Sequence, residues 1–133
     1  MDIKNDLESL RGLAARESQP APQVSTCPPI WPSLIAQTEP GAALIEKNGD
    51  GRVLRGLAER MRARMERGLA NYGMPLRAHN GREALADCQE EVLDALAYAE
   101  QARQEGRADH ALVNELFALA YKLEKMRMEA ADK

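Results

Sequence analysis

Apolar residues recur at intervals of three and four along most of the chain, which is the period of an amphipathic α-helix. Residues 51–72 carry the first long stripe: Leu54, Leu57, Ala58, Met61, Met65, Leu69 and Tyr72. A third helix after Asp109 carries another: Leu112, Val113, Leu116, Leu119, Leu123 and Met126. A second helix is expected to reach about residue 104, and a short one to cover residues 3–16. No segment alternates as a strand does, so the pattern predicts an all-α protein.

The ends of these helices are marked by residues that favour caps and turns. Gly73 suits the left-handed position after the first long helix, and Pro75 follows it. Asn80 is expected to cap the second helix, with Glu83 completing a capping box three residues later. Asp109 is expected to cap the third helix.

A proline-rich stretch separates the short helix from the three long ones. Prolines remove backbone donors and disfavour helix before them, so residues 17–33 are read as a linker or an extended arm. Trp31 lies among these prolines, either as a docked anchor or at one edge of the core. The sequence "NGDGR" at 48–52 predicts a turn. We therefore divide the chain into an N-terminal short helix and proline-rich arm at 1–50 and a helical domain at 51–133.

The composition suggests that one copy of this chain does not complete its own core. The chain has 133 residues, of which 44% are hydrophobic but only 4% aromatic, as in packed Ala- and Leu-rich helices. A bundle of three long helices with short connections leaves apolar faces uncovered, and a second copy often covers them. A homo-oligomer, either a dimer or a tetramer, is expected.

Charge and cysteine content narrow the possible environments. A net charge of −3 and few aromatic residues make nucleic acid an unlikely partner. Cys27 and Cys88 lie far apart and are expected to be reduced thiols, with Cys88 on the apolar face of the second helix, which fits a cytoplasmic protein. No apolar run approaches the length of a membrane span, and the charged N-terminus does not resemble a signal peptide.

The second helix has a column of like charges on the side opposite its apolar residues. At about 100° per residue, Leu85, Cys88, Val92, Leu96 and Ala99 share one side. The other side carries Glu83, Asp87, Glu90 and Asp94, with Glu91 beside them. Glu83 is expected to cap the helix, and we call Asp87, Glu90, Glu91 and Asp94 the acidic column. Like charges one turn apart cost about 0.3 kcal/mol per pair, so a cation is expected against the column.

Two sources of positive charge fit the acidic column. One is the first long helix, which has six arginines: Arg52, Arg55, Arg60, Arg62, Arg64 and Arg67. The other is a divalent metal, because Mg²⁺ and Mn²⁺ prefer hard oxygen ligands. Glu91 and Asp94 form an E-x-x-D pair on one helix face, which suits such an ion. On spacing alone both explanations stay open.

A longer string resembles a known family. Residues 64–99, "RMERGLANYGMPLRAHNGREALADCQEEVLDALAYA", cover about a quarter of the chain and resemble the short phage-encoded MazG-like nucleoside triphosphate pyrophosphatases. The resembling elements are Gly68, Leu69, Tyr72, Gly73, Leu76, Asn80, Gly81, Arg82, Asp87, Glu90, Glu91, Asp94 and Tyr98. The resemblance implies an all-α fold and Mg²⁺-dependent cleavage of nucleoside triphosphates to monophosphate and pyrophosphate. It also implies a role in phage nucleotide metabolism in the host cytoplasm.

The match to the family's metal ligands is partial. Glu91 and Asp94 match the E-x-x-D of the family, and Glu66 matches one end of its E-x-x-E. Ala63 stands where the other carboxylate of that motif would be. The missing ligand is expected from Asp87 or Glu90, or from another subunit. Among phage forms the resemblance is to the MazZ-type dGTP pyrophosphatases, which implies a purine (d)NTP substrate.

These observations give a candidate site. Two or more Mg²⁺ or Mn²⁺ ions are expected on Glu66, Asp87, Glu90, Glu91 and Asp94. The catalytic carboxylates would be Glu90, Glu91 and Asp94, one of them serving as general base. Arg82 is expected either to bind phosphate or to be solvated at the surface, Lys122 to bind pyrophosphate, and Asn80 to contact the base.

A non-enzymatic reading stays open beside this one. The chain would then be a helical oligomer or adaptor, in which the acidic column pairs with the arginines of the first long helix.

Overall fold

The computed structural model describes residues 19–38 and 51–132, and its regular elements in these ranges are all helices. They are α2 (Ile30–Ala36), α4 (Gly51–Tyr72), α5 (Ala84–Gln104) and α6 (His110–Ala131). The all-α prediction is confirmed, and the three long helices lie where the apolar stripes predict them. The expected helix at 3–16, most of the turn at 48–52 and the boundary drawn at residue 50 lie outside the described residues.

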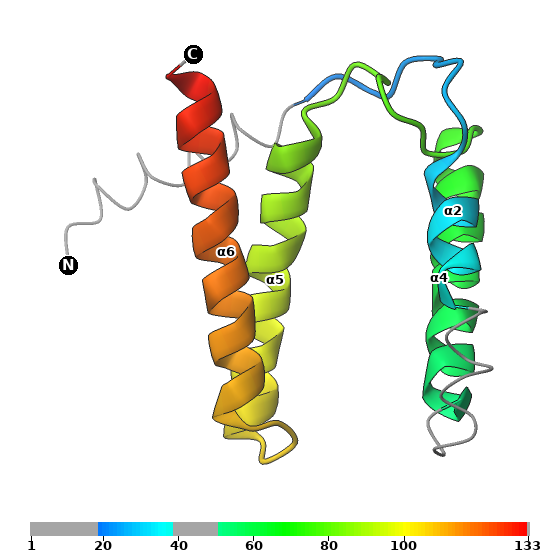
Figure 1. The fold of residues 1–133 in the computed structure, drawn as a ribbon. Coiled ribbons are helices and arrows are strands. Elements are labelled where there is room, and N and C mark those ends of the chain that lie inside the picture. Colours follow the sequence, from blue (N-terminus) through cyan, green and yellow to red (C-terminus); the bar gives the residue numbers. More distant parts are fainter. Residues whose placement is uncertain (1–18, 39–50, 133) are drawn as a thin grey trace. The chain divides into compact units, whose positions relative to one another are not determined.

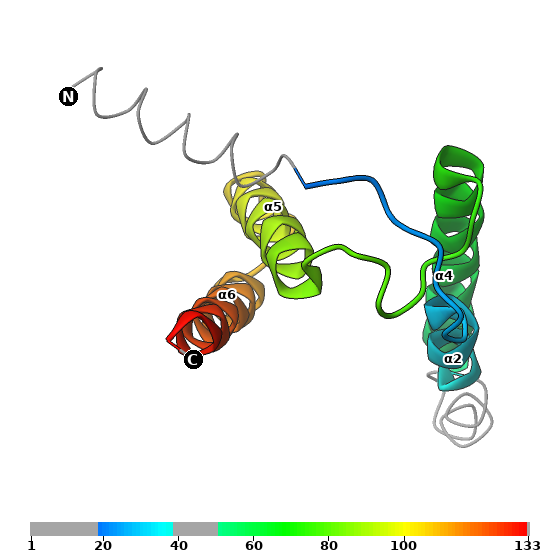
Figure 2. The ribbon, with the colours of Figure 1, turned by 90° about the horizontal axis from the view of Figure 1, so that it is seen from above.

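The described residues form two units, each a helix pair. Gln19 and residues 83–132 belong to one unit, and residues 20–38 and 51–82 belong to the other. In the first unit α6 packs alongside α5, and in the second α2 packs alongside α4 (Figures 1 and 2). The prediction of a single three-helix bundle concerns both units together and stays a prediction.

Helices α5 and α6 form an antiparallel hairpin (Figure 1). Gly106 turns the chain between them with a left-handed φ of 76°. Asp109 then caps α6, because its carboxylate accepts a hydrogen bond of 3.2 Å from the backbone N–H of Leu112. This cap is the one predicted from sequence. The residues that α5 and α6 bury most are small or aliphatic: Ala86, Ala99 and Leu123.

Part of the proline-rich segment is helical, which corrects the prediction of an arm throughout 17–33. Helix α2 begins directly after Pro29 and contains Pro32 in its first turn. The first backbone N–H groups of a helix have no acceptor within it, so a proline there removes no hydrogen bond. Trp31 lies in the same turn and is half-buried, while Ile35 of α2 is buried. Residues 19–29 are extended, as predicted.

The start of α5 also differs from its prediction. The helix begins at Ala84, with Glu83 at the N-cap and no capping hydrogen bond from the Glu83 side chain. Gly81 has a φ of 83°, which interrupts any helix running from Asn80. The Asn80 carboxamide oxygen instead accepts a hydrogen bond of 3.1 Å from the N–H of Arg82 in a local turn. The predicted capping box is therefore wrong.

The end of α4 follows its prediction. Gly73 has a φ of 69°, and its N–H donates to the Leu69 carbonyl at 2.8 Å. A glycine in this position satisfies a carbonyl that the helix itself leaves without a donor.

The contact surface between α5 and α6, here called the seam, contains Gln89 where Cys88 was expected. Gln89 is buried at 8% exposure, whereas Cys88 is exposed, so the prediction that Cys88 belongs to the core is wrong. The Gln89 amide donates to the Glu124 carboxylate at 2.6 Å, and its oxygen accepts from the Arg127 guanidinium. Periodicity of apolar residues does not reveal a buried polar side chain whose partners lie on another helix.

Large apolar side chains remain exposed on α6. Phe117, Tyr121 and Met128 are 63%, 69% and 59% exposed, although they follow one another at helical spacing. The hairpin thus buries only part of the apolar surface of its helices.

Replacing Gln89 should weaken the hairpin. We expect Gln89→Ala to lower the free energy of unfolding by about 1–3 kcal/mol, because Glu124 and Arg127 lose their partner in a partly buried setting. Urea unfolding followed by circular dichroism measures this. Gln101→Ala on the same helix removes only an exposed hydrogen bond to Glu105 and should change stability by less than about 0.5 kcal/mol. Equal effects of the two substitutions would contradict a structural role for Gln89.

Candidate functional site

The acidic column lies on the side of α5 that is turned away from α6. Gln89 marks the side that contacts α6, since it bonds to Glu124 and Arg127. At about 100° per residue, Asp87, Glu91 and Asp94 lie about 140–160° around the helix from Gln89, and Glu90 about 100°. The hairpin seam thus fixes the direction in which the column points, as the wheel predicts.

Three carboxylates of the acidic column have no cationic partner among the residues that the structure describes. Glu91 and Asp94 are exposed, and Glu90 is half-exposed. Across residues 19–38 and 51–132, none of the three makes a hydrogen bond or an ion pair. Their mutual repulsion is therefore not relieved by any described side chain.

The fourth carboxylate is held by the arm. The Asp87 Oδ1 atom accepts a hydrogen bond of 2.9 Å from Nε2 of Gln19, and Asp87 is half-buried. The other end of the Gln19 amide accepts a hydrogen bond of 2.7 Å from the N–H of Glu83. One neutral side chain thus joins the arm to the first turn of α5. Sequence reasoning missed Gln19, because nothing in a proline-rich segment shows which distant helix it will meet.

Glu100, further along α5, differs from the acidic column. Its oxygens accept hydrogen bonds from Nη2 and Nε of Arg103, at 2.6 and 2.9 Å, and from the Gln104 amide at 3.0 Å. The hydrogen bond from Arg103 and then that from Gln104 lower the pKa of Glu100 to about 2. Arg103 of α5 is therefore a basic partner for the last carboxylate of the helix, whereas Glu90, Glu91 and Asp94 have no such partner among the described residues.

The chemistry of the acidic column suits a hard divalent ion. Its four side chains offer only carboxylate oxygens, the ligands that Mg²⁺ and Mn²⁺ prefer, and successive members lie within one helical turn of each other. As their side chains lie, the described residues contain no group of three or more acids, histidines and cysteines placed to hold a metal ion. Glu66 is exposed on α4, which belongs to the other unit.

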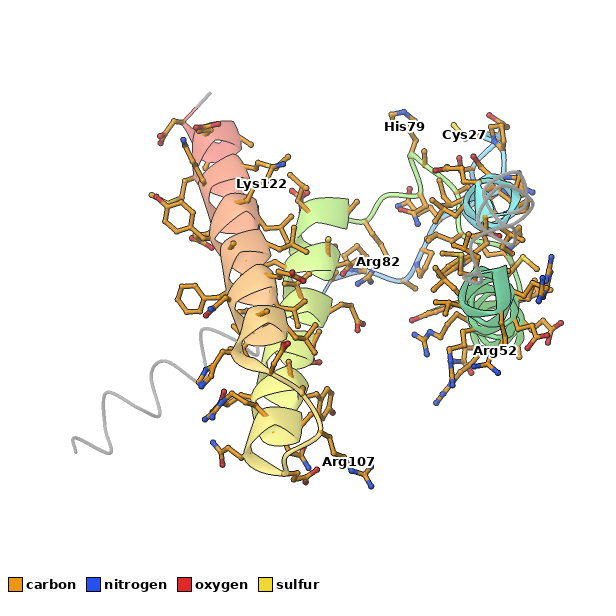
Figure 3. The ribbon with its side chains drawn as sticks, turned by 60° about the horizontal axis from the view of Figure 1, so that its bottom comes forward. Cys27, Arg52, His79, Arg82, Arg107 and Lys122 are labelled. Atoms are coloured by element: carbon orange, nitrogen blue, oxygen red, sulfur yellow. The ribbon has the colours of Figure 1, made fainter. Side chains whose placement is uncertain are left out.

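Asn80 and Arg82 lie in the loop before α5, and hydrogen bonds to the arm hold both of them. The Arg82 Nη1 atom donates to the carbonyl of Pro20 at 2.8 Å, and the Asn80 carbonyl accepts from the N–H of Gln23 at 2.7 Å. His79, labelled in Figure 3, directly precedes Asn80 in this loop. Its backbone has a left-handed φ of 57°. The predicted phosphate-binding arginine is thus half-buried and engaged with backbone.

The arm and the loop are joined further along by the same kind of contact. Ser25 donates to the Ala78 carbonyl at 2.5 Å, and the Arg77 guanidinium donates to the Cys27 carbonyl at 2.5 Å. The N–H of Ile30 donates to the Leu76 carbonyl at 2.8 Å. The extended arm is therefore bonded along its length to the loop that leads into α5.

Lys122, the predicted pyrophosphate ligand, is exposed on α6 (Figure 3). It makes no ion pair with any residue that the structure describes. Because the acidic column points away from α6, the hairpin does not place Lys122 beside it. Its role as a ligand stays a prediction.

No helix within the described ranges is long and apolar enough to cross a membrane. Comparison of the chain with models of known protein families, with curated proteins and with solved structures gives no match.

Proposed function

We propose that the chain is a metal-dependent nucleoside triphosphate pyrophosphohydrolase, which converts a (d)NTP and water to (d)NMP and pyrophosphate. The observation that carries the proposal is the acidic column, in which Glu90, Glu91 and Asp94 lack a basic partner among the described residues while Glu100 has one. The resemblance of residues 64–99 to MazG-like enzymes supports the same reading. It favours a purine (d)NTP such as dGTP and a role in phage nucleotide-pool control, in the cytoplasm of the host.

The acidic column would hold two or more Mg²⁺ or Mn²⁺ ions through Asp87, Glu90, Glu91 and Asp94, with Glu66 as a further ligand. Bound divalent ions neutralise phosphate charge and make a bound water more acidic. A carboxylate among Glu90, Glu91 and Asp94 that is not engaged as a ligand accepts the proton of the attacking water. The α5 N-terminus and Arg82 favour the negative charge of the phosphates, Asn80 contacts the base, and Lys122 would bind the departing pyrophosphate.

A homo-oligomer is part of the proposal. A second copy would cover large apolar side chains that are exposed on two helices. They are Phe117, Tyr121 and Met128 on α6, and Leu57, Leu69 and Tyr72 on α4. Another copy could also supply the carboxylate that Ala63 does not.

The alternative is a non-enzymatic helical oligomer or adaptor. The exposed arginines of α4 favour it, because six arginines stand against two glutamates in that helix and could neutralise acids elsewhere. In that case neither stability nor assembly would respond to divalent ions.

The products of the reaction distinguish these functions. Incubation with each NTP and dNTP plus Mn²⁺ should give monophosphate and pyrophosphate together, because the attack falls between the α- and β-phosphates. Anion-exchange chromatography resolves the products, and a chelator should abolish them. Diphosphate and orthophosphate as primary products would exclude the proposed reaction, and no turnover of any nucleotide would favour the adaptor.

Asp94→Asn tests the acidic column directly. The substitution keeps the side-chain shape but removes a charge and weakens a hard-ion ligand. We expect turnover to fall by about two orders of magnitude or more, and the rise in melting temperature on adding Mn²⁺ to shrink. Without metal, the variant should be as stable as the parent or slightly more stable, since repulsion with its neighbours is relieved.

Glu115→Gln is the matched control for this test. Glu115 is exposed on α6 and lies outside the acidic column, so the same loss of charge should leave turnover and the Mn²⁺ shift unchanged. If Asp94→Asn behaves like Glu115→Gln, the column is not the metal site.

Assembly gives a separate prediction. The chain has a mass of 14.7 kDa, and sedimentation velocity at micromolar concentration should show a dimer or a tetramer. Burial of the exposed apolar surface of α4 and α6 drives this association. A monomer across the micromolar range would refute it.

A further inference from the structure

Six side chains form a row along α6, which we call the outer stripe. They recur at alternating intervals of four and three residues, the spacing that keeps one face of a helix turned toward a partner helix in a coiled coil. At 1.5 Å per residue the row covers about 27 Å of the helix. Its members are His110, Asn114, Phe117, Tyr121, Glu124 and Met128.

The outer stripe lies outside the seam. Leu123, at 6% exposure, marks the side of α6 that packs on α5. At about 100° per residue, Phe117, Tyr121 and Met128 lie about 120–160° around the helix from Leu123. Among the described residues of α6, these three are the most exposed large apolar side chains. Single exposed apolar residues are common on protein surfaces, whereas a row of them along one face marks an interaction site.

The spacing of the outer stripe favours a second copy of the same chain as its partner. The intervals are 4, 3, 4, 3 and 4 residues, so they read the same from either end of the stripe. When two such helices run antiparallel about a two-fold axis, every stripe residue therefore lies opposite a stripe residue of the other copy. The facing pairs, each of which occurs twice, are Phe117 with Tyr121, Asn114 with Glu124, and His110 with Met128.

The chemistry of these pairs favours the antiparallel direction. Aromatic rings, which attract each other edge to face or offset, meet at the centre of the contact. In a parallel pair, Glu124 would lie opposite Glu124 of the other copy, and the two like charges would repel each other. In the antiparallel pair, Glu124 instead faces the neutral amide of Asn114. A polar pair within a helix interface also sets its register.

The surroundings of the outer stripe leave room for this contact. The Glu124 Oε2 atom accepts a hydrogen bond of 2.6 Å from Gln89 within the hairpin. Among the described residues this is the only hydrogen bond of Glu124, and a carboxylate accepts at both of its oxygens. Ala111 and Ala118 lie beside the stripe on the side away from α5, and such small side chains let a second helix approach closely.

We propose that two copies of the chain associate through the outer stripe, with α6 of one copy antiparallel to α6 of the other. The inference rests on the homo-oligomer in the proposed function, whose contact face it identifies. It requires neither a bound metal nor a substrate. The hairpin of α5 and α6 is then the part of each chain that joins the copies.

Tyr121→Gln tests the contact face. The substitution removes an aromatic ring twice per dimer, and Tyr121 is exposed, so each copy should keep its helical content by circular dichroism. We expect the Kd for self-association of the full chain, measured by sedimentation equilibrium, to rise about 10-fold or more. Tyr98→Gln is the matched control, because Tyr98 is equally exposed at 69% but lies on α5. Its Kd should match that of the parent.

Disulfide cross-linking tests the direction of the helices. In a background with Cys27→Ser and Cys88→Ser, one variant carries His110→Cys and a second carries Met128→Cys. These positions are about 27 Å apart within one helix but face each other between antiparallel copies. Oxidation of a mixture should therefore link the two variants, whereas neither variant should link to itself. A linked dimer from either variant alone, or none from the mixture, would overturn the inference.

The inference and the proposed function fail in different ways. If Tyr121→Gln self-associates as tightly as the parent, the outer stripe is not the contact, although the homo-oligomer stands. If the parent is monomeric at micromolar concentration, the homo-oligomer is wrong and the inference falls with it. The outer stripe would then be a surface for residues 1–18 or for another protein. The products formed from nucleotides test the pyrophosphohydrolase independently of both outcomes.

Discussion

The seam between α5 and α6 determines the direction of every side chain on α5. It is made of small and aliphatic residues, Ala86, Ala99 and Leu123, and of one buried glutamine. Alanine allows close approach of two helices but specifies their rotation weakly, because it has no side chain to interlock. Gln89 supplies that specificity, since its amide must meet Glu124 and Arg127 together. A rotation of α5 that lost these contacts would also turn the acidic column to another direction.

Charge is distributed unevenly between the helices. Helix α4 has six arginines and two glutamates, whereas α5 has five carboxylates and a single arginine, Arg103. That arginine is committed to Glu100 at the far end of the helix. Segregation of this kind costs stability within each helix, and a bound cation or a partner of opposite sign would relieve that cost. The proposed enzyme and the adaptor differ in which of these two applies.

Helix positions and fold class could be predicted from the sequence, because they depend on periodicity and caps that are local. The structure agrees with the predicted helix at 51–72, the predicted turn at Gly73 and the predicted cap at Asp109. The errors have non-local causes. Helix α5 starts late because Gly81 is left-handed in a loop bonded to the arm, and the seam contains Gln89 instead of Cys88 because its partners come from α6.

The candidate site was predictable to a similar degree. The acidic column and its direction follow from helical spacing alone, and the structure agrees with that geometry. Gln19 could not be foreseen, because a glutamine beside prolines gives no sign of a helix more than sixty residues away. The position of Glu66 relative to the column depends on both units together, which periodicity does not address.

The two units also differ in how they can form during synthesis. The chain passes between them twice, after Gln19 and after Arg82, so residues 20–82 are an insertion within the unit that contains the hairpin. Every contact within that insertion can form before residue 83 leaves the ribosome. The contacts of Gln19 cannot, because Glu83 and Asp87 are still inside the ribosome at that point. Gln19 is therefore synthesised early but completes its hydrogen bonds only after α5 has emerged. Until then, the hydrogen bonds between the arm and the loop keep Gln19 close to the start of α5.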